Sequence, residues 1–267
     1  MQLPPLNSPC LQQGRCSARP DAKDRGGLRQ PDHFASIKHT YGKERSAPLD
    51  AGLLSAELYL AEPIREGAAY PRQRNYHGYY WMASTRAHVW HESLHERDWL
   101  MRLDFAGDIV ALASQPMKLT GSDGVIHYPD FLALDARGVQ TVYDVKPAAR
   151  INAKARAQFE WTRDLCQDVG WDYRVLADIS AQERVNLLFL SQFRHPNNHP
   201  GTEPAQELAS AAQPGWTIND ATRQLPAAST ALARRGLFHL MWTRTFTADL
   251  TQRLSGRTPL DLGTTAG

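Results

Sequence analysis

Apolar and polar positions between residues 128 and 145 predict two strands joined by a tight turn. Residues 128–134 form an apolar run that ends at the turn sequence Asp-Ala-Arg-Gly, residues 135–138. Residues 139–145 then alternate in a composition rich in β-branched and aromatic side chains, which is typical of a strand. The pattern therefore predicts a β-hairpin.

The segments that follow this hairpin predict a helix and a further strand. Pro147 ends the hairpin because it cannot donate to the ladder of a sheet. Residues 152–169 predict a helix, and Gly170 is a suitable residue to end it. Residues 171–176 predict the next strand. Strands alternating with a helix indicate an α/β fold.

Upstream of the hairpin, residues 89–105 predict an amphipathic helix. Its apolar members are Val89, Trp90, Leu94, Trp99, Leu100, Met101 and Leu103. Glu92 and Glu96 are four residues apart, so both lie on one face of this helix. Ser93 and Glu96 also have the spacing of a capping box, in which Glu96 would bond back to the backbone. The apolar pattern begins before Ser93, however, which favours an earlier start.

The last third of the chain predicts mostly helices. Residues 182–194 predict a helix, and residues 195–214, rich in Pro, Asn, Gly, Ala and Ser, predict a linker or long loop. Helices are predicted over 216–225 and 227–243, and a short strand over 246–250. Helices followed by a strand pair are the order of a winged helix-turn-helix.

Three features refine this C-terminal prediction. Thr217 is a candidate N-cap, and Gly236 predicts a break inside the longer helix. Four arginines are candidates for phosphate contacts. They are Arg223, Arg234, Arg235 and Arg244.

Two N-terminal segments are unusual in composition. Residues 1–45 are rich in proline and basic residues, which predicts a disordered tail, either a loose DNA-contacting arm or a stretch without function. Residues 70–86 interleave aromatic side chains with arginines. This segment predicts either a nucleic-acid stacking surface or a strand pair with one aromatic core face.

Composition bounds the class of protein. The chain has 267 residues, 42% of them hydrophobic and 22% charged, which is enough for one large domain or two modest ones. No apolar run is long enough for a membrane span, and we expect no secretory leader. The net charge of +2 does not by itself indicate nucleic acid. We expect a cytoplasmic protein, associated with the nucleoid when bound to DNA.

Several kinds of site are not expected. Three scattered cysteines, Cys10, Cys16 and Cys166, favour neither a disulfide framework nor a zinc site. The chain has no glycine-rich P-loop, so we expect no ATPase activity.

Two aspartates and a lysine supply the candidate chemistry. Asp130 opens the first strand of the hairpin and Asp144 closes the second, so both lie at the end away from the turn. Lys146 is two residues after Asp144 and projects from the same face of the strand. Carboxylates can hold a divalent cation and a lysine can sit beside the attacking water, which is the requirement of metal-dependent phosphodiester cleavage. Alternatively, Asp130 ends a turn and Lys146 simply pairs with Asp144.

This arrangement resembles the PD-(D/E)xK nuclease superfamily. Further motifs resemble TnsA, the endonuclease subunit of heteromeric transposases, over about residues 70–255. These motifs are Tyr70-Pro71-Arg72-Gln73-Arg74-Asn75-Tyr76-His77-Gly78, Glu92-Ser93-Leu94-His95-Glu96-Arg97-Asp98-Trp99-Leu100, Leu103-Asp104-Phe105 and Ser114-Gln115-Pro116.

The resemblance implies a site. The helix acid of the family maps onto Glu96, although Glu92 stays an alternative, and the other acids map onto Asp130 and Asp144. With the carbonyl of Val145, these residues would bind Mg²⁺ or Mn²⁺. Lys146 would orient the water and stabilise charge. Gln115 lies near the site or is a plain strand terminus, and the second is favoured.

The resemblance also implies an architecture and partners. We expect a restriction-endonuclease-like core, a mixed sheet flanked by helices, followed by a small winged-helix domain. The predicted boundaries are a tail at 1–45, the endonuclease domain at 46–176, the winged-helix-like domain at 177–258 and a tail at 259–267. The partners would be double-stranded DNA at transposon ends, a DDE-type transposase of the TnsB kind and an AAA+ regulator.

Three other functions stay open. The chain could be a restriction or repair nuclease of the same superfamily. It could also be a catalytically silent DNA-binding or assembly protein, in which Asp130, Asp144 and Lys146 would not converge. A small-molecule hydrolase is disfavoured because no histidine ligands accompany the acids.

Overall fold

The computed structural model describes residues 33–38, 43–65 and 76–263. Its strands are β1 (Phe34–Ile37), β2 (Arg45–Pro48), β3 (Gly78–Met82), β4 (Ala87–His91), β5 (Ile109–Ser114), β6 (Met117–Thr120), β7 (Ile126–His127), β8 (Phe131–Asp135), β9 (Gln140–Val145), β10 (Asp172–Leu176), β11 (Phe246–Thr247) and β12 (Asp261–Leu262). Its α-helices are α1 (Leu94–Ala106), α2 (Ala153–Val169), α3 (Ala181–Leu190), α4 (Thr202–Ala211), α5 (Ile218–Gln224) and α6 (Thr230–Trp242).

One mixed sheet carries the predicted hairpin. Its strand order is β10-β9-β8-β5, with β8 and β9 antiparallel and β9 and β10 parallel. The turn of the hairpin contains Gly138 at φ +84°, a backbone conformation that suits glycine. The predicted hairpin, the following helix and the next strand are confirmed. Asn152 caps α2 at its start, and Gly170 ends it at φ +94°.

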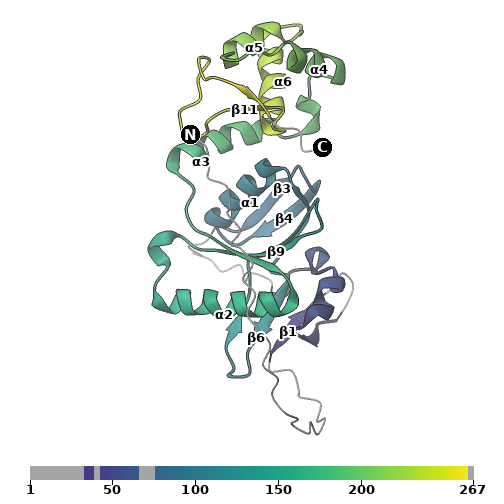
Figure 1. Ribbon diagram of the computed structural model, residues 1–267, viewed down its shortest axis with the longest axis vertical. Coiled ribbons are helices and arrows are strands. Elements are labelled where there is room, and N and C mark those ends of the chain that lie inside the picture. The colour runs from purple at the N-terminus through teal and green to yellow at the C-terminus, as the bar shows by residue number, and fades with distance from the viewer. Residues whose placement is uncertain (1–32, 39–42, 66–75, 264–267) are drawn as a thin grey trace, which may run out of the picture. The chain divides into compact units, whose positions relative to one another are not determined.

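Helices cover both faces of this sheet, which makes the fold a mixed α/β arrangement. Leu132 and Val142 share a buried cluster with Leu165 of α2, and α2 runs along the sheet in Figure 1. Phe131 and Leu100, a residue of α1, belong to a second buried cluster. Alternation along β8 therefore sends successive side chains into two cores.

A second sheet has the order β2-β1-β6-β7. Strand β1 lies inside the stretch predicted as a disordered tail, and its Ala35 and Ile37 are fully buried. The expectation of disorder is therefore wrong for residues 34–37. Four residues give a weak local signal, and β1 is held by pairing with β6, which is remote in sequence. Residues 1–32 and 39–42 of the predicted tail lie outside the described part of the chain, as do residues 70–75 of the segment predicted over 70–86.

The predicted helix over 89–105 begins later than expected. Val89 and Trp90 belong to β4, which pairs with β3, and α1 begins at Leu94. Ser93 is the N-cap, and its side chain accepts a hydrogen bond from the backbone N–H of Glu96. Apolar side chains at the end of β4 precede those of α1 at a spacing that also fits a helix, so the pattern alone does not mark where the strand ends.

The C-terminal helices also differ from the prediction. Helix α4 lies within the predicted linker, where Leu208 is buried and packs in the common core. Helix α6 runs through Gly236 without a break. A Cβ at Gly236 would meet the Cβ of Pro200 at 2.9 Å and the Cδ2 of Leu225 at 3.1 Å. Glycine therefore permits a close approach here and does not interrupt the helix.

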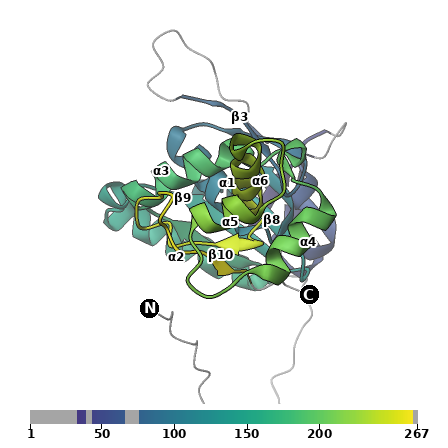
Figure 2. The same cartoon turned by 90° about the horizontal axis from the view of Figure 1, so that it is seen from above.

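The predicted cap at Thr217 and the start of a strand at residue 246 are confirmed. Thr217 caps α5 in a capping box with Asp220, and Figure 2 shows α5 beside α6. Phe246 begins a strand, but β11 is only two residues long and pairs with β12. Strand β12 lies in the stretch predicted as a tail, residues 259–267. This stretch is anchored because Leu260 is buried and its backbone N–H donates to the carbonyl of Trp216.

The core extends across the predicted domain boundary at 176/177. Leu100 of α1, Leu187 of α3 and Leu237 of α6 belong to one buried cluster. Phe105 and Trp242 stack edge to face with ring centroids 5.4 Å apart. The domain boundaries stay a prediction. Within the described ranges, no helix combines the length and apolar character needed to cross a membrane.

Candidate functional site

Asp130 and Asp144 lie opposite each other at the open end of the β8–β9 hairpin. Phe131 pairs with Tyr143, which places the two aspartates one position further along. The backbone N–H of Asp130 donates to the carbonyl of Tyr143 at 3.0 Å. Its carboxylate accepts from the N–H of Val145 at 2.6 Å. Local backbone pairing thus brings both acids together at the end away from the turn, as the hairpin predicted.

Negative charge gathers around Asp130. Burial raises the pKa of its carboxyl well above the ordinary value, and the nearby carboxylates of Asp144 and Glu96 raise it further. The Val145 N–H acts in the opposite direction because it stabilises the ionised form. A proton or a bound cation would relieve this repulsion.

Asp144 is buried and fully engaged by neighbouring side chains. The Nε2 atom of His127 lies 2.8 and 2.9 Å from its two carboxylate oxygens. The hydroxyl of Tyr173 donates to the same carboxylate at 2.5 Å. The side-chain amide of Gln158 lies 2.5 Å from Nδ1 of His127 and donates to it, so Nε2 carries the proton given to Asp144. Burial, followed by Asp144, raises the pKa of Tyr173 above its ordinary value.

Glu96 forms part of the capping box that its spacing with Ser93 suggested, because its carboxylate reaches the backbone N–H of the residue before the N-cap. Its carboxylate accepts from the hydroxyl of Ser93 at 2.7 Å and from the backbone N–H of Glu92 at 2.8 Å. Burial raises its pKa. Glu92 turns to Arg65 instead, with a 2.6 Å ion pair. Glu96 is therefore both a cap for α1 and a member of the acidic group around Asp130.

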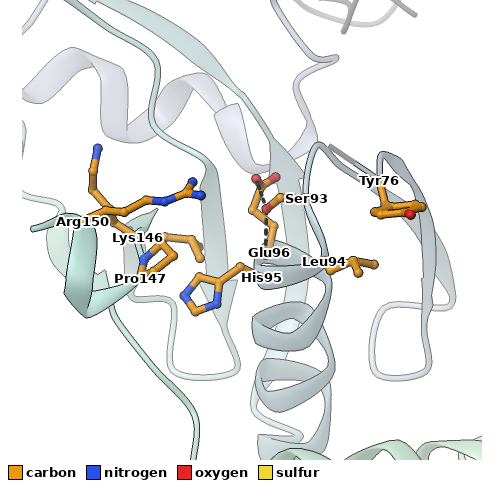
Figure 3. A pocket seen from close by; sticks show the side chains of 9 residues that line it. Tyr76, Ser93, Leu94, His95, Glu96, Lys146, Pro147 and Arg150 are labelled. Atoms are coloured by element: carbon orange, nitrogen blue, oxygen red, sulfur yellow. Dashed lines mark hydrogen bonds between the residues drawn. The ribbon is translucent and has the colours of Figure 1, made fainter. Parts of the chain in front are cut away.

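A pocket of about 370 Å³ adjoins these acids. Its lining residues are Tyr76, Ser93, Leu94, His95, Glu96, Val145, Lys146, Pro147 and Arg150. Figure 3 shows Lys146 and Arg150 on one wall, facing Glu96 and Ser93. Asp130 and Asp144 do not line this pocket, although Val145 joins it to the carboxylate of Asp130.

Lys146 extends from the last residues of the strand into this pocket. Its backbone N–H donates to the carbonyl of Leu176 at 2.9 Å, which continues the pairing of β9 with β10. Among the residues that the structure describes, no ion pair joins Lys146 to Asp144. The alternative in which Lys146 merely pairs with Asp144 is therefore wrong for this arrangement.

The candidate ligands have the oxygen atoms that a hard cation prefers, but these atoms are not arranged around a common centre. All candidate ligands are carboxylate or carbonyl oxygens, which suit Mg²⁺ and Mn²⁺. Over the described ranges, however, no three His, Cys, Asp or Glu side chains gather closely enough to hold a metal ion. Asp144 is turned to His127 and Tyr173, and Glu96 to the start of α1. The residues fit a cation by charge and do not form a ligand set as they stand.

Two contributors had no assigned role in the sequence. His127 directly precedes the apolar run at 128–134, but only the folded arrangement shows its contact with Asp144. The contact of Tyr173 follows from the parallel register of β10 with β9, which the structure supplies. Tyr173 of β10 pairs with Val142 of β9, and Val175 pairs with Asp144, so Tyr173 and Asp144 share one face of the sheet.

Gln115 was expected either to lie near the site or to be a plain strand terminus, and it is both. It follows β5 directly, and its backbone N–H donates to the carbonyl of Asp130 at 2.8 Å. It adopts a left-handed backbone with φ +45° and is 2% exposed. Its Oε1 is buried and accepts no hydrogen bond from the described residues. Gln115 is therefore a strand terminus that also supports the site.

Compared with protein-family models and with curated proteins, the chain matches none.

Proposed function

We propose that this chain is a metal-dependent DNA endonuclease of the PD-(D/E)xK type, acting as the nuclease subunit of a heteromeric transposase. One observation carries the proposal. Asp130 faces Asp144 at the end of the hairpin, within electrostatic reach of Glu96, while Lys146 enters the adjoining pocket from the same strand end. Carboxylates and a lysine at one strand end are the residue types that phosphodiester hydrolysis uses.

Each residue has a role in this proposal. Asp130, Asp144, Glu96 and the carbonyl of Val145 would hold Mg²⁺ or Mn²⁺, once Asp144 and Glu96 exchange their present partners for the cation. Such a cation supplies neutralisation of charge on the scissile phosphate. Lys146 would hold the attacking water and stabilise charge in the transition state.

The pocket offers further contacts to the nucleic-acid backbone. Arg150 and His95 line it beside Lys146. Guanidinium and imidazole groups commonly contact phosphate oxygens and position a duplex without reading its sequence. In the proposed assembly, the chain cuts one strand at each transposon end, and a DDE-type transposase cuts and joins the other. An AAA+ regulator would control this complex, which would act in the cytoplasm on the nucleoid.

A cleavage assay tests the proposal. The substrate is DNA carrying the ends of the element that encodes the chain, with Mg²⁺ or Mn²⁺, alone and with the neighbouring transposase. Lys146→Ala and Asp130→Ala should abolish cutting. Lys154→Ala, which removes an exposed lysine on α2, is the matched control and should cut like the unaltered protein.

The outcomes separate the candidate functions. Nicking that survives in both site variants would contradict the assigned site. Cutting of DNA that lacks transposon ends would favour a restriction or repair role, provided that no transposase gene lies beside the gene for this chain. The absence of cutting with the partner present, while DNA is still bound, would favour a silent assembly protein. The engagement of Asp144 by His127 and Tyr173 is the observation that supports this second candidate.

A further inference from the structure

The β3–β4 hairpin presents an outward face made largely of aromatic rings. Tyr79 pairs with Trp90 and Trp81 pairs with His88 across the two strands. Alternation places these four side chains on one face, while the opposite face carries the buried Tyr80. Only Tyr80 among these aromatic residues is therefore buried in the core, and the others lie on the outer face.

Rings of this outer face contact one another at both ends of the hairpin. His77 and Trp90 lie 5.2 Å apart, and Tyr79 meets Trp90 at 5.1 Å. At the other end, Trp81 stacks on His195 at 5.3 Å. Tyr79 is 68% exposed and Trp90 is partly buried. We call His77, Tyr79, Trp81, His88, Trp90 and His195 the aromatic face.

The charge around the aromatic face is positive. Residues 76–91 contain no Asp or Glu, and the turn of the hairpin carries the exposed Arg86. Arg194 serves the inner side instead, because its guanidinium lies 5.0 Å from the ring of the buried Tyr80 and donates to the backbone carbonyls of Trp81 and Ser191. Among the described residues, no carboxylate forms an ion pair with Arg86. A polyanion with flat rings complements such a surface.

We propose that the aromatic face binds unpaired nucleotides of single-stranded DNA, with bases stacking on Tyr79 and Trp90 and phosphates near Arg86. Bases in a duplex are stacked on each other, so exposed rings favour an unpaired strand. The binding itself does not depend on cleavage.

The aromatic face is also continuous with the candidate site. Tyr76 is 73% exposed, lines the same pocket as Lys146 from its other side, and directly precedes His77 in the chain (Figure 3). A strand held on the face would therefore lead towards the pocket. This second part rests on the proposed function, and it names unpaired DNA next to the cut as the form of substrate recognised.

The test is a binding titration with a fluorescent oligothymidylate of about 12 nucleotides, a length that falls within the site sizes of known stacking surfaces. The titration uses the full chain in EDTA, so that cleavage plays no part and failure of the nuclease proposal leaves this result intact. Tyr79→Ala and Trp90→Ala should each weaken binding about tenfold. Tyr79→Phe keeps the ring and should change it less than about twofold.

Tyr59→Ala is the matched control, since Tyr59 lies in a short helical turn at residues 58–60, outside the aromatic face. It should bind like the unaltered chain, and thermal unfolding confirms that each variant is folded. Four results would overturn the proposal. They are absence of binding, equal binding by folded Tyr79→Ala, equal competition by a duplex of the same length, and equal competition by inorganic polyphosphate. Absence of binding would leave the face to a protein partner.

Discussion

His127 donates from Nε2 to the carboxylate of Asp144 at 2.8 Å and so joins β7 to the end of β9. The contact connects the two four-stranded sheets at the candidate site. It also fixes which way the carboxylate of Asp144 faces.

Removal of this contact should destabilise the protein. His127→Ala leaves the buried Asp144 with Tyr173 as its remaining side-chain donor, and loss of one partner of a buried group costs about 1–3 kcal/mol. Urea unfolding measures the change. His88→Ala removes an exposed histidine and should change the free energy of unfolding by less than about 0.5 kcal/mol. Equal stability of the two variants would contradict a structural role for the His127 contact.

Divalent cations should stabilise the folded chain if the acidic group binds them. Binding to the folded state alone adds about 2.7 kcal/mol at a cation concentration about 100 times Kd. Thermal unfolding with and without Mn²⁺ should show an increase in Tm for the unaltered chain and a smaller or absent increase for Asp130→Asn. The same increase in both proteins would place the cation elsewhere.

Stability should decline in mild acid because of His239. Burial lowers the pKa of this side chain and outweighs the hydrogen bond to the carbonyl of Phe193, which raises it, while the nearby His199 and His195 lower it further. Its folded pKa is therefore below the unfolded value of about 6.5, so the unfolded state binds more protons as pH falls through this range. The stabilisation is present above about pH 6.5 and is lost as pH falls through the folded pKa.

Urea unfolding at about pH 7.5 and about pH 5.5 checks this expectation, since the two values lie on either side of the ordinary histidine pKa. His239→Gln should reduce the loss of stability between them without removing it, because burial lowers the pKa of His91 as well. A loss that is unchanged in His239→Gln would assign the effect to other groups.

Gly236 tests the close approach within the C-terminal helices. Gly236→Val places side-chain atoms where Pro200 and Leu225 already lie within 3.1 Å of a Cβ, and overpacking of this kind costs about 1–3 kcal/mol. Ala231→Val introduces the same β-branched side chain at an exposed position of α6 and serves as the control. Similar free energies of unfolding for the two variants would show that α6 shifts to make room.

Local signals in the sequence were sufficient where neighbours in the chain are also neighbours in space. The β8–β9 hairpin is closed by its own turn, and α2 is bounded by Asn152 and Gly170, so both the hairpin and the helix were predictable. The meeting of Asp130 and Asp144 followed from the hairpin alone.

Contacts between remote segments could not be predicted in the same way. Strand β1 depends on β6, and the engagement of Asp144 by Tyr173 depends on the register of β10. The start of α1 was missed even though its cap at Ser93 was visible, because strand and helix periodicities are hard to separate in a short apolar run.

The double role of Glu96 makes the first turn of α1 sensitive to whatever enters the pocket. A ligand that draws the carboxylate of Glu96 away must release the backbone N–H of Glu92, which donates to it at 2.8 Å. That amide would then exchange its hydrogen with solvent more rapidly. Hydrogen exchange at a single backbone position would thus report occupancy of the pocket, even for a ligand that is bound and never cleaved.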